Sequence, residues 1–302
     1  MMTTTYVGID LHKRTQTWVA LAENGKDTLF TREFPVTPAG VEAGIKLSKS
    51  CGEKIVVAIE PTCGWLWVVP LLRECGMEVH ISNPRKVKAI ADSLQKTDKN
   101  DATTLAQLVR TGIMHESSEV SPEMQTLRAI VRERVFLVRL RASMKCRLES
   151  VVTRNGRHRI EGSLSSQKGK TALIESGERE WKRSLDVIAD LSAYVTALDK
   201  EVATYAKQPI PKLLMTLPGV GTITAVSMWA EVGDYARFST PEKLCAFAGL
   251  VPTERSSGGV QKLGRITKAG STILRYILVE AAMRIRDTEK SNVLYQFYKT
   301  IK

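Results

Sequence analysis

Two aspartates stand close together in the segment KTDKNDATTLAQLV and could act on one substrate. Asp98 and Asp101 share a helical face with Leu105, Leu108 and Val109, so packing of those apolar residues would turn both carboxylates toward the protein core. Converging carboxylates repel one another and lose hydration, at a cost of several kcal/mol per ion, unless cations neutralise them. The spacing therefore raises the hypothesis of a site for divalent cations.

Each aspartate also has a plainer interpretation. Aspartate is a favoured N-cap, which would account for Asp98, and an acid in the first helical turn complements the helix dipole, which would account for Asp101. Two more acids have to be weighed with them. Asp10 interrupts an apolar strand, where aspartate is disfavoured, whereas Glu60 before Pro61 could be a solvated strand end. Only the four acids together favour a cation site over these separate explanations.

The four acids can meet if the strands that carry two of them are neighbours. Strand alternation places Asp10 on the face of Gly8 and Glu60 on the face of Ala58, and both small residues leave room beside the acids. The helix with the two aspartates, packed on the same face, would complete the group. Because the chain has only four histidines, we expect oxygen ligands, which suit Mg²⁺. Two such ions would activate the attacking group and stabilise the leaving oxygen of a phosphodiester displacement.

The elements that would position these acids form an α/β domain. Its strands are expected at residues 4–11, 16–22, 29–36, 54–60 and 77–82, with helices beginning near 37 and 65 and a last helix ending near 111. Asn24 and Gly25 offer the chemistry of a tight turn, and Thr37 before Pro38 predicts a capped helix start. Three strands followed by helix, strand, helix, strand and helix is the order of a ribonuclease-H-like fold.

A long arginine-rich segment follows this domain. Between Arg128 and Arg159 the sequence has nine arginines and one lysine against two glutamates, and its apolar spacing predicts one long helix. A second helix returns with an apolar seam at spacings of three and four, which is typical of a coiled coil. The pair could be an intramolecular antiparallel arm or a dimerising arm. The sequence KQPIPK at its end predicts a linker.

The last part of the chain is predicted to be mainly helical, with a serine beside two glycines. Ser257, preceded by Ser256, stands among basic residues, although Gly-Gly after serine is also usual in a flexible turn. No histidine follows His158, so a local Ser-His-Asp triad cannot form, and the cations favour a phosphate over an acyl target. LPGVG resembles a helix–hairpin–helix turn, whose backbone N–H groups can hold a phosphate.

The whole chain is basic. Its 302 residues carry a formal net charge of +12, which favours a polyanionic partner, first of all nucleic acid. The residues expected to contact nucleic acid are Arg128, Arg132, Arg139, Lys145, Gly219, Gly221, Arg255, Lys262, Arg265 and Lys268. No apolar run is long enough to span a bilayer, and the five cysteines are scattered without a CxxC pair. We therefore expect no membrane partner and a cytoplasmic, nucleoid-associated location.

Five motifs, in this order, resemble those of transposases of the insertion sequence 110 family, which are related to the Piv DNA invertase. They are VGIDLHK, AIEPTCG, KTDKNDATTLAQL, LPGVG and FAGLVPTERSSGG with GRITKAGSTILRYILVEAA, and together they cover nearly the whole chain. The resemblance implies a RuvC-like DEDD domain at 1–118, a basic helical coiled-coil arm at 119–208 and a mainly α-helical C-terminal transposase domain at 209–302. Family members commonly continue with further basic helices, so a sequence that stops at Lys302 is expected to be shortened.

The resemblance also assigns roles. It implies that the four acids form a DEDD tetrad that binds Mg²⁺, and that Ser257, rather than Ser256, forms a covalent phosphoserine link to DNA. The implied partners are DNA, a noncoding bridge RNA and further copies of the chain in a dimer or tetramer, in a bacterium or archaeon. Three alternatives remain: a RuvC-like junction nuclease in which water attacks, a Piv-like DNA invertase, and an inactive nucleic-acid-binding remnant.

Overall fold

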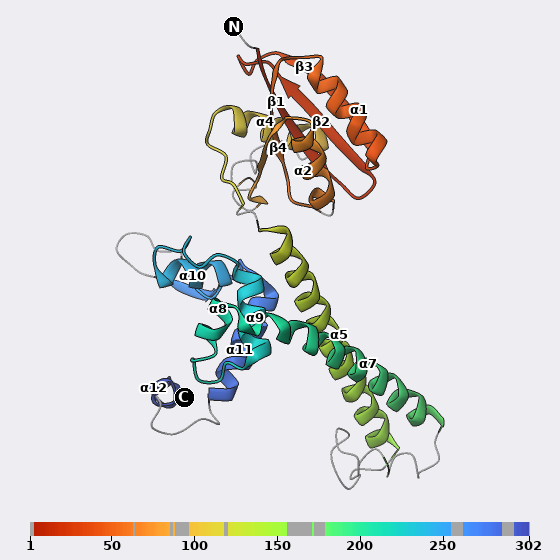
Figure 1. The fold of residues 1–302 in the computed structure, drawn as a ribbon, viewed down its shortest axis with the longest axis vertical. Coiled ribbons are helices and arrows are strands. Elements are labelled where there is room, and N and C mark those ends of the chain that lie inside the picture. The colour runs from red at the N-terminus through yellow and green to blue at the C-terminus, as the bar shows by residue number, and fades with distance from the viewer. Residues whose placement is uncertain are drawn as a thin grey trace. The chain divides into compact units, whose positions relative to one another are not determined.

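The computed structural model describes residues 3–62, 64–84, 87, 97–117, 120–155, 171, 179–254, 262–285 and 293–301 (Figure 1). The chain divides into two compact units, Met1–Glu119 and Val120–Lys302. Among the described residues, no helix combines the length and the apolar character that crossing a membrane requires.

The first unit contains a five-stranded mixed sheet. Its strands are β1 (Thr4–Leu11), β2 (Thr15–Leu21), β3 (Thr28–Pro35), β4 (Lys54–Ile59) and β5 (Glu78–Ile81). They lie in the order β3-β2-β1-β4-β5, with β1 antiparallel to β2 and parallel to β4. The prediction that the first and fourth strands are neighbours is confirmed, and the unit has the α/β character expected from the sequence.

Helices cover both faces of this sheet. The helices are α1 (Pro38–Lys49), α2 (Trp65–Glu74) and α4 (Asp98–Arg110), and Thr37 caps α1 as predicted. The larger apolar core lies between the sheet and α1 with α2, and includes Val7, Ile9, Trp18, Val41, Ile45, Val68 and Leu72. On the opposite face, α4 packs on the sheet through Ala102, Leu105, Ala106 and Leu108, which contact Val19, Leu21 and Ala58. Because successive side chains of a strand point to opposite faces, α1 and α2 pack on one face of the sheet and α4, which carries the two aspartates, packs on the other.

Gly8 allows α4 to lie directly against β1. A Cβ atom at this position would stand 1.8 Å from the carbonyl oxygen of Ala102 and 2.7 Å from the amide nitrogen of Ala106. Atoms cannot approach this closely, so only glycine lets the helix backbone reach the strand. The interpretation that a small residue here leaves room for an acid is thereby revised, because the backbone of α4 fills that room.

Two long helices of the second unit form an antiparallel pair. They are α5 (Pro122–Arg154), capped by Ser121, and α7 (Arg179–Thr204). Arg134 of α5 forms an ion pair with Asp199, whereas Leu148 and Val152 pack near the start of α7, on Trp181, Leu185 and Ile188. The two helices therefore run in opposite directions within one chain, which is the intramolecular alternative.

Shorter elements complete the second unit. They are η1 (Tyr205–Lys207), α8 (Pro209–Leu214), α9 (Thr222–Val232), α10 (Pro241–Ala248), α11 (Thr272–Ile285) and α12 (Val293–Ile301), with a hairpin of β6 (Pro252–Glu254) and β7 (Leu263–Ile266). Val226 of α9 lies in a core with Val131 of α5, Val202 of α7 and Ile277 of α11. The long helix ends at Thr204, shortly before KQPIPK, and Pro209 of that segment begins the short helix α8, so a linker there stays a prediction.

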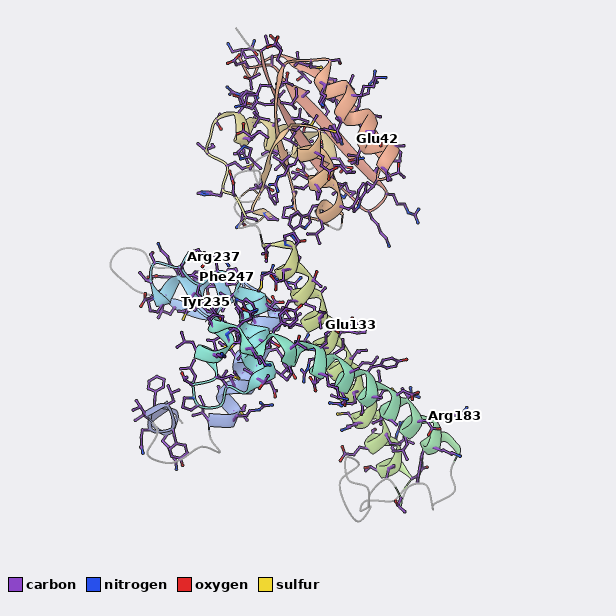
Figure 2. All side chains as sticks on the ribbon, in the orientation of Figure 1. Glu42, Glu133, Arg183, Tyr235, Arg237 and Phe247 are labelled. Carbon is purple, nitrogen blue, oxygen red and sulfur yellow. The ribbon has the colours of Figure 1, made fainter. Side chains whose placement is uncertain are left out.

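Aromatic side chains support the segment between α9 and the hairpin. Figure 2 shows Tyr235, Arg237 and Phe247 close together beside α10. The Arg237 guanidinium carbon lies 4.4 Å from the ring centroid of Phe238 and 4.6 Å from that of Phe247. Burial raises the pKa of Tyr235 to about 12, because the phenolate would lose its hydration. These side chains pack against one another, and the Arg237 guanidinium stacks on the rings of Phe238 and Phe247.

Candidate metal centre and catalytic residues

Asp10 and Asp98 converge where β1 ends and α4 begins, and a histidine lies between them. Asp10 is 4% exposed, and its Oδ2 atom is buried without a hydrogen-bond partner. His12 Nε2 lies 3.0 Å from this Oδ2 atom and 3.3 Å from Oδ1 of Asp98. One donor atom from each of the three residues falls within 4.8 Å of the others. Within the described residues, this group has the spacing that a metal ion requires.

The charges of this group act on one another. Burial raises the pKa of Asp10, the charge of His12 lowers it, and the charges of Asp98 and Asp101 raise it again, with a net upward shift. Burial lowers the pKa of His12, but the charges of Asp10 and Asp98 outweigh it, so that pKa is also raised. Asp101, in the first turn of α4, is therefore near enough to act on Asp10. The aspartates of this site therefore carry more negative charge than His12, the weak base beside them, can balance.

Glu60 occupies the matching position on the neighbouring strand. The parallel register pairs Gly8 with Ala58 and Ile9 with Ile59, so Asp10 and Glu60 each come one residue after the last pair. Alternation then predicts that both side chains take the face of Gly8 and Ala58, which is the face of α4. Glu60 is half-buried. Its part in a metal site stays a prediction from this register.

Two details differ from the sequence interpretation. Thr97 is the N-cap of α4, where its Oγ1 accepts a hydrogen bond from the amide of Asn100, so the plainer interpretation of Asp98 as the cap is wrong. With the cap position taken, the carboxylate of Asp98 is free to turn toward Asp10. The expectation of oxygen ligands alone also left out His12. Its position two residues after Asp10, hence on the same side of an extended strand, was the signal that could have revealed it.

The candidate serine falls, in the sequence, between Glu254 at the end of β6 and Leu263 at the start of β7. Ser256, Ser257 and the basic Arg255 lie outside the described residues. The flanking chain is fixed by Arg275 of α11, whose Nη1 donates 2.9 Å hydrogen bonds to the carbonyl oxygens of Ala248 and Gly270. One guanidinium thus joins the segment that enters the hairpin to the segment that leaves it. The exposed Lys262, Arg265 and Lys268 lie just before, on and shortly after β7.

Four arginine and lysine residues of α5 were predicted to contact nucleic acid, and most have protein partners. Arg128 donates to the carbonyl oxygens of Ala230 and Glu231, and burial lowers its pKa. Arg132 holds both carboxylate oxygens of Glu231, at 2.9 and 3.2 Å. Arg139 lies over the ring of Tyr276, and Lys145 also makes an intramolecular contact. Their role toward nucleic acid stays a prediction.

The glycines of LPGVG lie between α8 and α9. Gly219 has a positive φ of 79°, and a Cβ there would stand 2.5 Å from the carbonyl oxygen of Ala281 in α11. The glycine is therefore required for the turn and for close packing on α11. Gly221 is the N-cap of α9, and a Cβ there would make an ordinary 3.9 Å contact with Nη1 of Arg284. This geometry does not test the predicted phosphate contact at Gly219 and Gly221, which stays a prediction.

Comparison with known families gives the class of this protein. A family model for DEDD transposases of IS110 elements, described as "Transposase", matches residues 7–155, and the model "Transposase IS116/IS110/IS902 family" matches residues 211–299. The two matches take in the carboxylate cluster and the sequence segment of the candidate serine. They therefore define a transposase. More particularly, the chain belongs to the IS110 family of insertion-sequence transposases.

Curated relatives agree with this assignment. The chain is 29% identical over 296 residues to the putative transposase y4qE of Sinorhizobium fredii, covering 93% of this chain and 72% of the relative. It is 25% identical over 291 residues to the transposase for insertion sequence element IS1111A of Coxiella burnetii, covering 91% and 76%. The transposase for element IS1328 of Yersinia enterocolitica is 25% identical over 291 residues, covering 93% and 84%.

Proposed function

We propose that this chain cuts and rejoins DNA as the transposase of an insertion sequence, using a tetrad of carboxylates that binds two Mg²⁺ ions and a serine that links to DNA. The observation that carries the proposal is the buried carboxylate of Asp10, whose ionised form the nearby charges of Asp98 and Asp101 disfavour and the half-exposed His12 offsets only in part. Such an arrangement is costly unless cations complete it. The order of the strands, which is that of ribonuclease-H-like folds, supports a RuvC-like domain around the site.

The donor set fits a hard divalent cation. Asp10, Glu60, Asp98 and Asp101 would supply the oxygen ligands, with retained waters filling the remaining positions. Bound ions at this place supply Lewis-acid stabilisation of the charge that develops on the phosphodiester oxygens. The protein's own part is to hold the carboxylates on β1, at the end of β4 and on α4; the absence of a side chain at Gly8 brings β1 and α4 into contact.

The serine would carry the covalent step. Its hydroxyl oxygen forms a bond to the DNA phosphorus while the bond from that phosphorus to one sugar oxygen breaks. The sugar oxygen takes up a proton and leaves as a hydroxyl group. Attack by a DNA hydroxyl on the phosphoserine then reverses the exchange, which frees Ser257 and rejoins the strands. Lys262, Arg265 and Lys268, all exposed, would bind the phosphates that flank the reacting one.

The proposed assembly contains DNA, a structured noncoding bridge RNA that pairs with it, and two or four copies of this chain. The antiparallel pair of long helices α5 and α7 supports the idea of a coiled-coil arm. Its basic helix α5 also exposes the apolar side chains of Phe136 and Leu140. A net charge of +12 supports binding to both nucleic acids. The cytoplasm of a bacterium or archaeon is the place where such an assembly would act.

The serine step is tested with a matched pair of variants, Ser257→Ala and Ser256→Ala. Each is incubated with Mg²⁺, RNA transcribed from the noncoding part of the element and DNA that carries the element ends, then analysed on a denaturing gel for protein bound covalently to DNA. We expect the wild type and Ser256→Ala to form the adduct, and Ser257→Ala to form none. An adduct that survives in Ser257→Ala, or that is lost only in Ser256→Ala, contradicts the assignment.

The alternatives predict different gels. A junction nuclease in which water attacks would nick DNA without any adduct, and Ser257→Ala would nick at the wild-type rate. A nucleic-acid-binding remnant would break no strand at all, and would still show binding that weakens steeply with salt. A Piv-like invertase shares the adduct, and is separated from a transposase by whether the recombined product inverts the intervening DNA or joins it to a new target.

A further inference from the structure

His12 is placed unusually for a half-exposed histidine. Its side chain is 50% exposed, and yet a single ring nitrogen, Nε2, lies within 3.3 Å of carboxylate oxygens from two different elements. One of these oxygens, Oδ2 of Asp10, is buried and lies 3.0 Å from Nε2. A single nitrogen that faces carboxylate oxygens from two different elements has the arrangement of a ligand set.

The spacing of the three atoms matches the corners of an octahedron. Ligands of an octahedral ion at about 2.1 Å from the centre stand about 3.0 Å apart when adjacent and about 4.2 Å apart when opposite. Nε2 lies 3.0 and 3.3 Å from the two oxygens, and all three atoms lie within 4.8 Å of one another. An ion could therefore enter among them with little movement of the side chains.

We propose that His12 Nε2 is a direct ligand of the divalent cation held by Asp10 and Asp98, so that one metal position of the tetrad is a mixed nitrogen and oxygen site. This inference rests on the proposed carboxylate metal site and adds a ligand to it. Magnesium prefers hard oxygen ligands, whereas imidazole is a good ligand for transition metals. The position containing His12 therefore favours Mn²⁺ relative to Mg²⁺ more than a site of carboxylates and water would.

A second histidine in the same unit provides the contrast and the control. His80 on β5 also lies between two acids, with Nδ1 2.7 Å from Glu116 and Nε2 3.0 Å from Glu78. Each of its nitrogens serves one carboxylate, so no single nitrogen faces two acids there. We assign the metal site to His12 and not to His80 on this difference.

The test uses Mn²⁺ bound to the full chain as a spin probe. Pulsed electron paramagnetic resonance detects the coupling of a ¹⁴N nucleus that is bonded directly to the ion. We expect this coupling in the wild type and in His80→Ala, and its loss in His12→Ala. The dissociation constant for Mn²⁺ should rise by about tenfold or more in His12→Ala, and that for Mg²⁺ by less. Circular dichroism of each variant checks that the fold is retained.

The outcomes separate this inference from the proposed function. If Asp10→Asn leaves Mn²⁺ binding at wild-type strength, the carboxylate site itself is wrong. If Asp10→Asn weakens Mn²⁺ binding but wild type shows no nitrogen coupling, the tetrad stands and His12 is only a counter-charge of the metal-free form. Tighter Mn²⁺ binding in His12→Ala, or a coupling that His80→Ala removes, also overturns the assignment.

Discussion

Two buried carboxylates, one in each unit, have opposite surroundings. Asp10 in the first unit is 4% exposed and has an oxygen without a hydrogen-bond partner, and the charges of two further aspartates act on it. Glu231 in the second unit is 2% exposed, and both of its oxygens are engaged, by Arg132 and by a 2.7 Å hydrogen bond from the Ser271 hydroxyl. Burial is the same in both, and the partners differ.

The difference teaches which buried acids to regard as functional. Glu231 is paired and joins three helices, because Arg132 comes from α5 and Ser271 also caps α11 by accepting from the amide of Leu274. That carboxylate is complete and holds the second unit together. Asp10 has like charges nearby that His12 offsets only in part, because its pKa stays raised, and this destabilises the fold unless a cation completes the site. Unfavourable electrostatics of this kind are typical of functional sites.

The largest expected effect is the loss of DNA cleavage in Asp10→Asn. We expect strand cleavage in Mg²⁺ to fall by about a thousandfold or more, because a metal ligand is removed while the shape of the side chain is kept. Cleavage assays at saturating Mg²⁺, with circular dichroism to confirm folding, measure this. If Asp10→Asn cleaves DNA at the wild-type rate, Asp10 is not needed for cleavage and is, like Glu231, a structural buried acid.

The same variant is expected to gain stability in the absence of metal. Since burial and the neighbouring acids raise the pKa of Asp10 above its ordinary 3.8, its ionised form destabilises the folded state at any pH above that value. Asparagine removes this cost, so Asp10→Asn should unfold at a higher temperature than the wild type at pH 7 in a chelator. The gain should shrink as the pH falls below the raised pKa of the folded state, and should vanish well below 3.8, where the aspartate is neutral in both the folded and the unfolded state.

A smaller but still large effect is expected from Gly8→Ala. The new methyl group would collide with the backbone of α4, and we expect a loss of about 3 kcal/mol in the free energy of unfolding, with weaker Mn²⁺ binding as α4 moves from β1. Gly64→Ala is the control, because its Cβ would make an ordinary 3.4 Å contact with Leu11. Equal unfolding midpoints for the two variants in urea would mean that α4 does not depend on Gly8.

The smallest of these effects is expected from Glu231→Gln. Loss of the charge in a buried pair with Arg132, whose side chain is 52% exposed, should lower the free energy of unfolding by about 2 kcal/mol. Glu133→Gln on the exposed surface of α5 should change it by less than about 0.5 kcal/mol. Cleavage per folded molecule should stay at the wild-type level in both. If Glu231→Gln instead has a higher free energy of unfolding than the wild type, the ionised Glu231 destabilises the folded state, as is expected of Asp10.

Local sequence patterns were sufficient to predict most of the first unit. The alternation of apolar residues defined β1 and β4, and the mid-strand Asp10 marked the face on which the acids would meet. The spacing of Asp98 and Asp101 placed both in the first turn of α4, where their charges act on Asp10; their part in a metal site stays a prediction. These features could be predicted because each depends on residues only a few positions apart.

Features that depend on distant residues could not be predicted. Arg132 was expected to bind nucleic acid, and its partner Glu231 lies 99 positions away, which no local pattern reveals. The close approach of α4 to Gly8 depends on backbone atoms of a helix that begins 90 residues later. His12 was missed for a different reason: its reach to Asp98 depends on how the chain leaves β1, and a lone histidine after a strand has many ordinary explanations.

Anomalous diffraction from crystals grown with Mn²⁺ tests the central claim most directly, because it locates the ions without reference to activity. The claim predicts anomalous peaks within coordination distance of Asp10 and Asp98, with the carboxylates of Glu60 and Asp101 turned toward them. Crystals in which Mn²⁺ binds elsewhere, while any of these four carboxylates points away into solvent, would contradict it.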